Sequence, residues 1–272
     1  MKYLILGSSG FIGKHLVRYI LSNHHDVIEF DIYNSKLEDL RINNCSNLKS
    51  KCLEVDFVFF LAFDVGNSEY LSNNDLNYEF INNNVNIMNN TFHILSICQK
   101  PFIFVSSQMA NFTDTTYGLL KKLGEKYTMA LGAVFVRLWN VYGDELYSKK
   151  SHVITDFIHQ AKAFNHIRIK SNGQEERQFL FINDCINCLL ILSQKYNQIN
   201  RKEILDVTSF AFTRIITLAN ILKENIPDLK IDTTGKYAWY NRKTTPSKYV
   251  LTFWKPEVEI NEGIRILLNN YK

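Results

Sequence analysis

A short apolar run that leads directly into three evenly spaced glycines constrains this chain more than any other feature. The run covers residues 2–6, and Gly7, Gly10 and Gly13 follow it in "GSSGFIG". Next come "FIGKHLVRYILSN", with apolar residues at helical spacing, and "HDVIEFD", a second short strand candidate. This order predicts a β-α-β unit with a tight glycine turn between the first strand and the helix.

A turn of this kind suits a pyrophosphate, because glycines let backbone N–H groups and the helix N-terminus approach the phosphates closely. Asp31 ends the second strand about 20 residues further on, where a carboxylate accepts hydrogen bonds from an adenosine ribose. An ordinary turn residue is the alternative for Asp31. The combination predicts a dinucleotide site. Since a carboxylate repels a 2′-phosphate, Asp31 favours NAD(H) over NADP(H), although nearby Lys36 weakens that preference.

Further strand-like runs alternate with helix-length segments in "VDFVFFLA", "PFIFVSS" and "AVFVRLW". Continuous apolar strands between helices indicate a parallel sheet covered on both faces. We therefore expect an α/β fold, a Rossmann-type doubly wound parallel sheet with a smaller C-terminal substrate-binding lobe. The expected division is residues 1–145 for the dinucleotide-binding domain, with its sheet completed by about 184–222, and residues 146–183 and 223–272 for the lobe.

Composition excludes several function classes. The net charge is only +4, and no stripe of Lys and Arg interleaved with aromatics supports nucleic-acid binding. No apolar run approaches the about 20 residues that span a bilayer, and Met1 leads into the first strand without a cleavable leader. We expect a cytoplasmic protein without a nucleic-acid or membrane partner.

The five cysteines are odd in number and scattered, which argues against a disulfide framework. Cys185 and Cys188 form one C-x-x-C with no second ligand pair after it. Two buried thiols on one helix face are expected there, rather than a metal or redox site.

A second chemical feature lies in "TTYGLLKKLGEKY", where Tyr117 and Lys121 are four residues apart and share one helical face. Ser107 ends the strand-like run ten residues before Tyr117. The three form a proton-transfer site in which the lysine charge is expected to lower the phenol pKa towards neutrality, while the serine positions a carbonyl or alcohol oxygen. A Tyr and a Lys at this spacing also occur as ordinary surface residues of a helix.

Together these motifs resemble the extended short-chain dehydrogenases/reductases, in the epimerase/dehydratase branch that acts on nucleotide-diphosphate sugars. The resemblance runs nearly end to end. It is carried by "GSSGFIG", "FLAF", "NNNVN", "FVSSQ", "YGLLK", "RLWNVYG", "RQFLFIND" and "WKPEVEINEGI".

The resemblance implies roles for particular residues. Ser107, Tyr117 and Lys121 match the catalytic trio; the first two also touch the sugar, and Lys121 also binds the nicotinamide ribose. Asn140 and Arg177 match positions that contact the substrate diphosphate; apart from the resemblance they are a turn residue and a surface arginine. The cofactor contacts implied are Gly7, Gly10, Phe11, Ile12, Gly13, Asp31 and Ala62.

Two departures from the family pattern stand out. Phe60 and Phe63 replace the polar or small residues common around the strand beside the cofactor, and we expect them to change packing more than chemistry. "DVTS" (residues 206–209) lacks the glycine common in the matching loop, which puts that loop's contacts in doubt. The family also implies a homodimer, built from the helix in "NYEFINNNVNIMNNTFHIL" and the helix that carries Tyr117.

The choice of reaction depends on the segment after Ser107. Gln108 and Met109 cannot act as the acid and base that the family's dehydratases use, so dehydration is not expected. The short gap to Tyr117 resembles the small 4-ketoreductases that finish deoxy sugars, such as CDP-paratose and CDP-abequose synthases. We expect reduction of a nucleotide-linked 4-keto-6-deoxy sugar for a surface polysaccharide such as lipopolysaccharide.

Two alternatives stay open. The same trio serves a 4-epimerase that retains NAD, and Asp31 favours that reading. A non-catalytic dinucleotide-binding protein is the other, although such relatives usually lose the tyrosine or the lysine.

Overall fold

The computed structural model describes residues 1–42, 45–235 and 243–271, which form two compact units. The first comprises Met1–Leu138, Ile186–Val207 and Ser247–Lys255. The second comprises Trp139–Cys185, Thr208–Pro246 and Pro256–Lys272. The second unit thus begins at Trp139, whereas the sequence predicts a boundary after residue 145, and it also includes residues 208–222.

A six-stranded sheet forms the centre of the first unit, and all of its neighbouring strands run parallel. Its strands, in spatial order, are β2 (Asp26–Phe30), β1 (Lys2–Leu6), β3 (Phe57–Phe60), β4 (Phe102–Ser107), β5 (Val134–Leu138) and β9 (Leu205–Val207). The order reverses between β1 and β3, so the carboxyl ends of these strands form the crevice in which such sheets bind ligands. The expected Rossmann-type α/β fold is confirmed.

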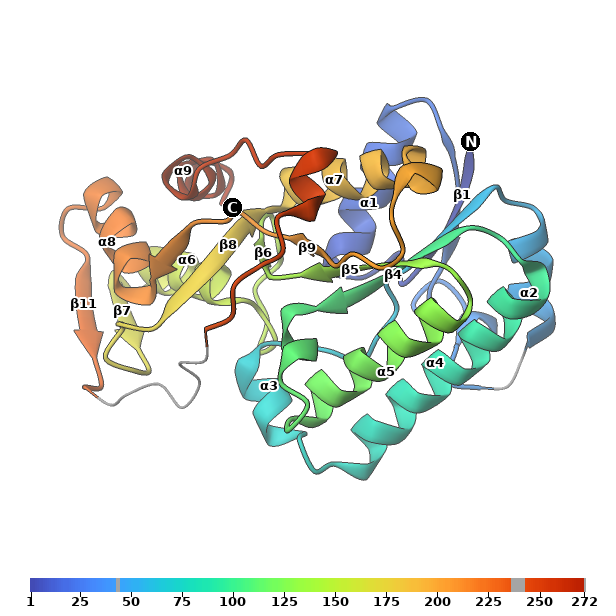
Figure 1. Ribbon diagram of the computed structural model, residues 1–272. Helices are drawn as coiled ribbons and strands as arrows, with labels where there is room; N and C mark the ends of the chain where they lie inside the picture. Colours follow the sequence, from blue (N-terminus) through green and yellow to red (C-terminus); the bar gives the residue numbers. More distant parts are fainter. Residues whose placement is uncertain (43–44, 236–242, 272) are drawn as a thin grey trace. The chain divides into compact units, whose positions relative to one another are not determined.

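Helices cover both faces of this sheet (Figure 1). On one face lie α1 (Phe11–Ser22) and α7 (Ile182–Gln194), joined by a hydrogen bond from the Tyr19 hydroxyl to Asn187. On the other lie α2 (Cys45–Leu53), α4 (Tyr78–Cys98) and α5 (Thr116–Ala130). Short helices complete the unit: η1 (Lys36–Glu38), α3 (Ser68–Asn73), η2 (Gln108–Asn111), η3 (Tyr196–Gln198) and η4 (Tyr249–Thr252).

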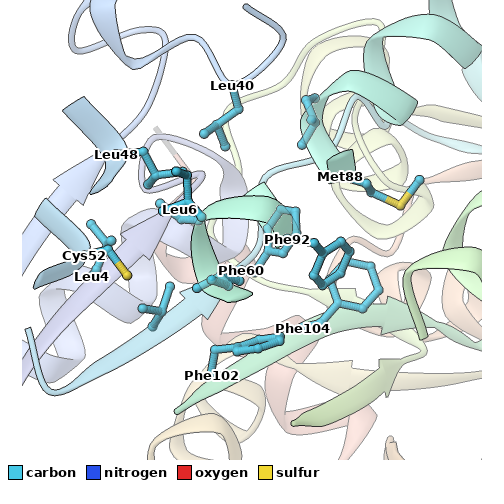
Figure 2. Close-up of a cluster of buried hydrophobic side chains, with 14 of the residues drawn as sticks. Leu4, Leu6, Leu40, Leu48, Cys52, Phe60, Met88, Phe92, Phe102 and Phe104 are labelled. Carbon is cyan, nitrogen blue, oxygen red and sulfur yellow. The ribbon is translucent and has the colours of Figure 1, made fainter. Parts of the chain in front are cut away.

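Alternate strand residues build a core on each face, since successive side chains point to opposite sides of a strand. Leu4, Leu6, Phe60, Phe102 and Phe104 pack with Met88 and Phe92 of α4 in one buried cluster (Figure 2). The intervening residues face the other way. Tyr3, for example, stacks on Phe59 at 5.7 Å between ring centres, and its hydroxyl hydrogen-bonds Ser193 of α7 at 3.2 Å.

The second unit contains two small sheets. One has the order β10-β8-β6 and the other pairs β11 with β7. Their strands are β6 (Asn140–Tyr142), β7 (His166–Ile169), β8 (Glu176–Phe181), β10 (Phe212–Arg214) and β11 (Lys230–Thr233). The helices are α6 (Val153–Phe164), α8 (Ile215–Asn225) and α9 (Ile260–Asn270).

Cys185 and Cys188 lie in α7, and both are buried, as expected. In the part of the chain that the structure describes, no helix is long and apolar enough to cross a membrane.

Candidate active site

The glycine turn between β1 and α1 is built so closely that side chains are excluded from it. Gly7 has φ +89°, and a Cβ there would lie 2.7 Å from the backbone nitrogen of Ala62. A Cβ at Gly13 would lie 2.1 Å from the carbonyl oxygen of Gly7. Glycine at these two positions therefore lets the start of α1 and the segment after β3 pack directly against the backbone of the turn.

Helix α1 begins directly at this turn. Gly10 is its N-cap residue, so no side chain covers the N–H groups of the first helical turn, where Phe11 and Ile12 lie. Exposed helix N–H groups beside a glycine cradle are the donors that a pyrophosphate accepts. The residues therefore fit the phosphates of a dinucleotide.

Asp31 is held at the edge of the same turn. The N–H of Gly7 donates to the carbonyl of Phe30 at 2.9 Å, which brings the end of β2 beside the glycines. The Asp31 carboxylate accepts the N–H of Ser9 at 3.0 Å and that of Tyr33 at 3.0 Å. A fixed carboxylate thus lies beside the glycine turn, at the position that the sequence predicts for ribose binding. Lys36 is exposed in η1.

The structure brings Ser107 and Tyr117 into contact. Ser107 is the last residue of β4, and its hydroxyl accepts the N–H of Met109 at 3.2 Å. Tyr117 lies in the first turn of α5, which Thr115 caps through the N–H of Gly118. Burial raises the pKa of Tyr117 to about 12, and its hydrogen bond with Ser107 acts in the opposite direction.

The sequence predicts a Tyr117 pKa near neutrality, and this prediction is wrong. Loss of solvent outweighs the stabilisation of the phenolate. The ammonium of Lys121 lies 5.9 Å from the centre of the Tyr117 ring and donates to the carbonyl of Val105 at 2.8 Å.

Lys121 itself is only 4% exposed. Burial lowers its pKa to about 7, and the negative charge of Glu125 opposes that shift. Its Nζ lies 3.7 Å from the centre of the Phe63 ring. The lysine is therefore buried among aromatic rings, where loss of solvent disfavours its charged form.

Asn140 and Arg177 lie in the second unit, on neighbouring strands. Asn140 begins β6, and its Nδ2 donates to the carbonyl of Gln178 at 3.1 Å. Arg177 lies in β8 and donates from Nη1 to the carbonyl of Glu176 at 2.8 Å. Burial lowers the pKa of Arg177. The fold thus puts both candidates for diphosphate binding in one small sheet.

The family assignment follows from a scan against known protein families, in which residues 3–208 match the NAD dependent epimerase/dehydratase family. The chain belongs to this family. The match covers the glycine turn, the Ser107, Tyr117 and Lys121 cluster, and both strands that carry Asn140 and Arg177.

Relatives that are named for different activities resemble the chain over most of its length. A putative UDP-glucose 4-epimerase of Methanocaldococcus jannaschii is 23% identical, and the alignment covers 98% of this chain and 97% of that one. A UDP-2-acetamido-2,6-beta-L-arabino-hexul-4-ose reductase of Pseudomonas aeruginosa is 26% identical over 70% of this chain and 49% of its own. Among solved structures, UDP-glucose 4-epimerase of Thermotoga maritima with UDP-glucose has a TM-score of 0.83 at 18% identity, covering 100% of this chain and 98% of that one.

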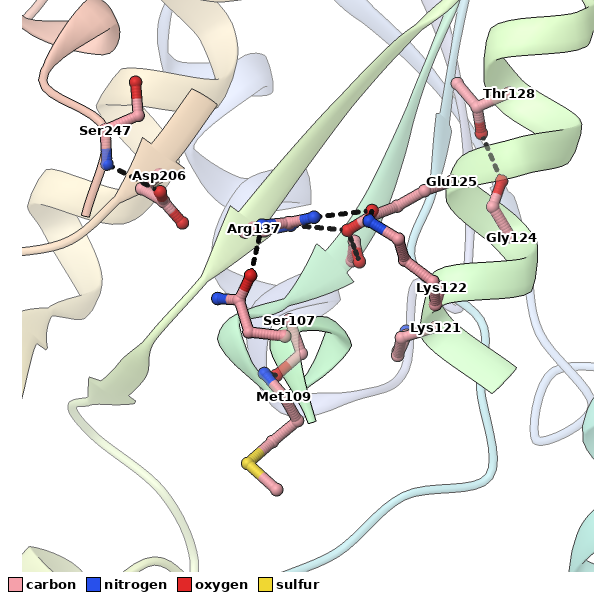
Figure 3. A network of polar contacts seen from close by, with 12 residues as sticks. Ser107, Met109, Lys121, Lys122, Gly124, Glu125, Thr128, Arg137, Asp206 and Ser247 are labelled. Atoms are coloured by element: carbon pink, nitrogen blue, oxygen red, sulfur yellow. Dashed lines mark hydrogen bonds and ion pairs between the residues drawn. The ribbon is translucent and has the colours of Figure 1, made fainter. Parts of the chain in front are cut away.

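Sequence reasoning missed the buried ion pair of Glu125 and Arg137, which Figure 3 shows together with Ser107 and Lys121. Glu125 of α5 and Arg137 of β5 are 1% and 3% exposed at their side chains, and Nε of Arg137 donates to Glu125 at 2.6 Å. The Ser106 hydroxyl donates to the same carboxylate at 2.8 Å, and Nη1 of Arg137 donates to Asn111 of η2 at 2.7 Å. An arginine inside the apolar run "AVFVRLW" was the available signal, because a charge in a buried strand requires a partner.

Proposed function

We propose that the chain is an NAD(P)-dependent oxidoreductase that reduces the 4-keto group of a nucleotide-linked 4-keto-6-deoxyhexose, in the synthesis of a surface-polysaccharide sugar. One observation carries the proposal: the Tyr117 phenol is partly buried and hydrogen-bonded to Ser107, and loss of solvent raises its pKa to about 12, which favours its protonated form. Reduction of a ketone needs a proton donor at the oxygen, whereas oxidation of an alcohol needs a base. The phenol is therefore in the form that reduction requires.

The short segment between Ser107 and Tyr117 also supports reduction. It consists of η2 and four further residues before α5 begins, and it leaves no inserted loop between strand and helix. Gln108 and Met109 both lie in η2 and offer neither an acid nor a base for dehydration. The side chains present suit proton donation to one oxygen.

Each residue of the trio has a role in this reaction. The hydride to C4 would come from a nicotinamide cofactor held by the glycine turn, Asp31 and Lys121. Ser107 holds the C4 oxygen by its hydroxyl, and Tyr117 donates a proton to that oxygen as its negative charge develops. Lys121 would hold a ribose hydroxyl of the cofactor with an N–H group, and its positive charge would favour release of the proton from Tyr117. Placement of the sugar by its diphosphate makes the step effectively unimolecular.

Asn140 and Arg177 are the proposed contacts of that diphosphate. A guanidinium can donate two parallel N–H groups to phosphate oxygens. Asn140 uses one amide N–H on Gln178 and has a second N–H for a ligand. Gly7, Gly10, Phe11, Ile12, Gly13 and Ala62 are the proposed contacts of the dinucleotide, and the Asp31 carboxylate favours NAD(H).

We further propose a homodimer formed by α4 and α5. Several apolar side chains on these helices are exposed, including Val85, Leu119, Leu123 and Tyr127. The two helices lie side by side on one face of the sheet (Figure 1). Pairing of such faces across a two-fold axis would bury them.

A 4-epimerase that retains NAD is the second candidate, favoured by Asp31 and by the epimerases among the relatives. Purified protein mixed with nucleotide-linked 4-keto-6-deoxy sugars and NADH or NADPH distinguishes the two. The ketoreductase oxidises one reduced nicotinamide per sugar. Interconversion of two nucleotide-linked sugars that carry a C4 hydroxyl and differ only at C4, in a parallel assay with no added NADH or NADPH, would replace it by the epimerase.

A further inference from the structure

The Phe63 ring contacts both candidate catalytic side chains of the helix α5. The Nζ of Lys121 lies 3.7 Å from the centre of this ring, well within the distance of a cation–π contact. The same ring meets that of Tyr117 edge to face, with 5.8 Å between centres and 78° between planes. A single side chain from the loop after β3 therefore touches the ammonium and the phenol ring.

The backbone beside Phe63 is fixed by a buried asparagine. Asn84 of α4 has no exposed surface; its Oδ1 accepts the N–H of Asp64 at 2.8 Å and its Nδ2 donates to the carbonyl of Asp64 at 3.1 Å. The Tyr70 hydroxyl also donates to the Asp64 carboxylate at 2.7 Å. Because both backbone groups of the next residue are bound, the loop holds the Phe63 ring in place over Lys121.

Besides the Phe63 ring, the Lys121 ammonium lies close to a backbone carbonyl and to a second aromatic ring. Val105 of β4 accepts one N–H, and the Phe104 ring centre lies 5.1 Å from Nζ. Among the residues that the structure describes, the charge that acts on this ammonium is that of Glu125 on the same helix, and Glu125 is itself bound to Arg137 of β5. The phenol ring of Tyr117 lies with its centre 5.9 Å from Nζ, and the Asp64 carboxylate, which follows Phe63 in the chain, accepts the Tyr70 hydroxyl.

We propose that Phe63 is a positioning residue that holds Lys121 in place and favours its charged form by presenting its ring face to the ammonium. The catalytic consequence rests on the proposed function, in which Lys121 and Tyr117 act together. Cation–π attraction grows where water is excluded, and Lys121 is nearly fully buried. Leucine at this position would keep the site dry but would offer no negative ring face.

The test is a direct NMR titration of Lys121 in the cofactor-free protein, with its signal assigned by its absence in Lys121→Met. In Phe63→Leu the titration midpoint should fall by about one pH unit, because the ammonium loses its aromatic partner while burial remains. Phe63→Tyr, which keeps a ring, should retain the wild-type midpoint. Phe57→Leu, the same change on the other face of the sheet, should also leave it unchanged.

An unchanged midpoint in folded Phe63→Leu, or equal shifts in Phe63→Leu and Phe63→Tyr, would overturn the proposal. Circular dichroism and thermal unfolding establish that each variant is folded. Because the titration needs neither sugar nor cofactor, it decides the role of Phe63 even if no 4-keto sugar is reduced. Conversely, if the protein reduces a 4-keto sugar but the titration midpoint of Lys121 does not depend on Phe63, the proposed function holds and the proposed role of Phe63 is wrong.

Discussion

The proposed chemistry depends on Tyr117, because its partly buried phenol is the proposed proton donor to the C4 oxygen. Tyr117→Phe removes the hydroxyl and keeps the ring against Phe63. Turnover should fall about 100-fold or more, the usual worth of a positioned general acid. Binding of NADH, measured by its fluorescence, should stay within about threefold of wild type, a limit well below that catalytic effect.

Wild-type turnover by Tyr117→Phe would remove this residue from the reaction. Ser107→Ala provides the comparison, since it deletes the partner hydroxyl and leaves the phenol present. It should reduce turnover less than Tyr117→Phe does, because the proton donor remains.

Lys121 makes stability depend on pH in a defined direction. Its pKa is about 7 in the folded protein, against the ordinary value of 10.5 that a solvated lysine of the unfolded chain has. Between these values the unfolded chain binds more protons, so the free energy of unfolding should rise with pH. This contribution has a slope of up to about 1.4 kcal/mol per pH unit.

Urea unfolding of wild type and Lys121→Met between pH 7 and pH 10 measures this slope. Methionine has a similar length but no proton to release, so the wild type should gain stability relative to the variant as pH rises. Parallel stability profiles for the two proteins would show that the buried lysine titrates normally.

At the scale of elements, the Glu125 and Arg137 pair joins α5 to β5 and, through Ser106 and Asn111, to β4 and η2 (Figure 3). Arg137→Met leaves the Glu125 carboxylate buried, with the Ser106 hydroxyl and the Lys122 ammonium still bound to it. We expect a loss of about 3–5 kcal/mol in the free energy of unfolding, because the buried carboxylate loses the guanidinium that binds both of its oxygens, and the partly exposed Lys122 ammonium compensates its charge less well.

The double variant Glu125→Leu with Arg137→Met should recover most of that loss, since it removes both charges together. Denaturant unfolding of the two single variants and the double variant completes the cycle. Additive losses would mean that the two side chains stabilise the fold independently.

For the whole molecule, the exposed apolar side chains of α4 and α5 are the proposed dimer surface. Leu119 and Leu123 are 54% and 41% exposed on α5. Leu123→Arg places a charge on this surface without touching the core, so the protein should become a monomer of unchanged fold. Sedimentation equilibrium measures the mass; a dimer that survives Leu123→Arg, or a wild-type monomer, would contradict the proposed interface.

Much of this architecture could be predicted because it depends on local patterns. Gly7 and Gly13 predict the tight turn, and apolar runs with intervening helices predict a parallel sheet. Long-range packing was harder to foresee. The contact of Phe63 with Lys121 joins residues 58 positions apart in the sequence, and the elevated pKa of Tyr117 follows from burial that no spacing reveals. Arg137 gave a signal in its apolar strand, but its partner lies on another element.

The reductase proposal is tested most directly by stoichiometry. Purified protein is mixed with each of a panel of nucleotide-linked 4-keto-6-deoxy sugars and either NADH or NADPH. The loss of reduced nicotinamide is measured from the decrease of its ultraviolet absorbance. We expect one sugar to oxidise one equivalent, with NADH preferred because Asp31 repels a 2′-phosphate. No net oxidation with any sugar, together with NAD that stays bound through purification, would contradict reduction and support 4-epimerisation.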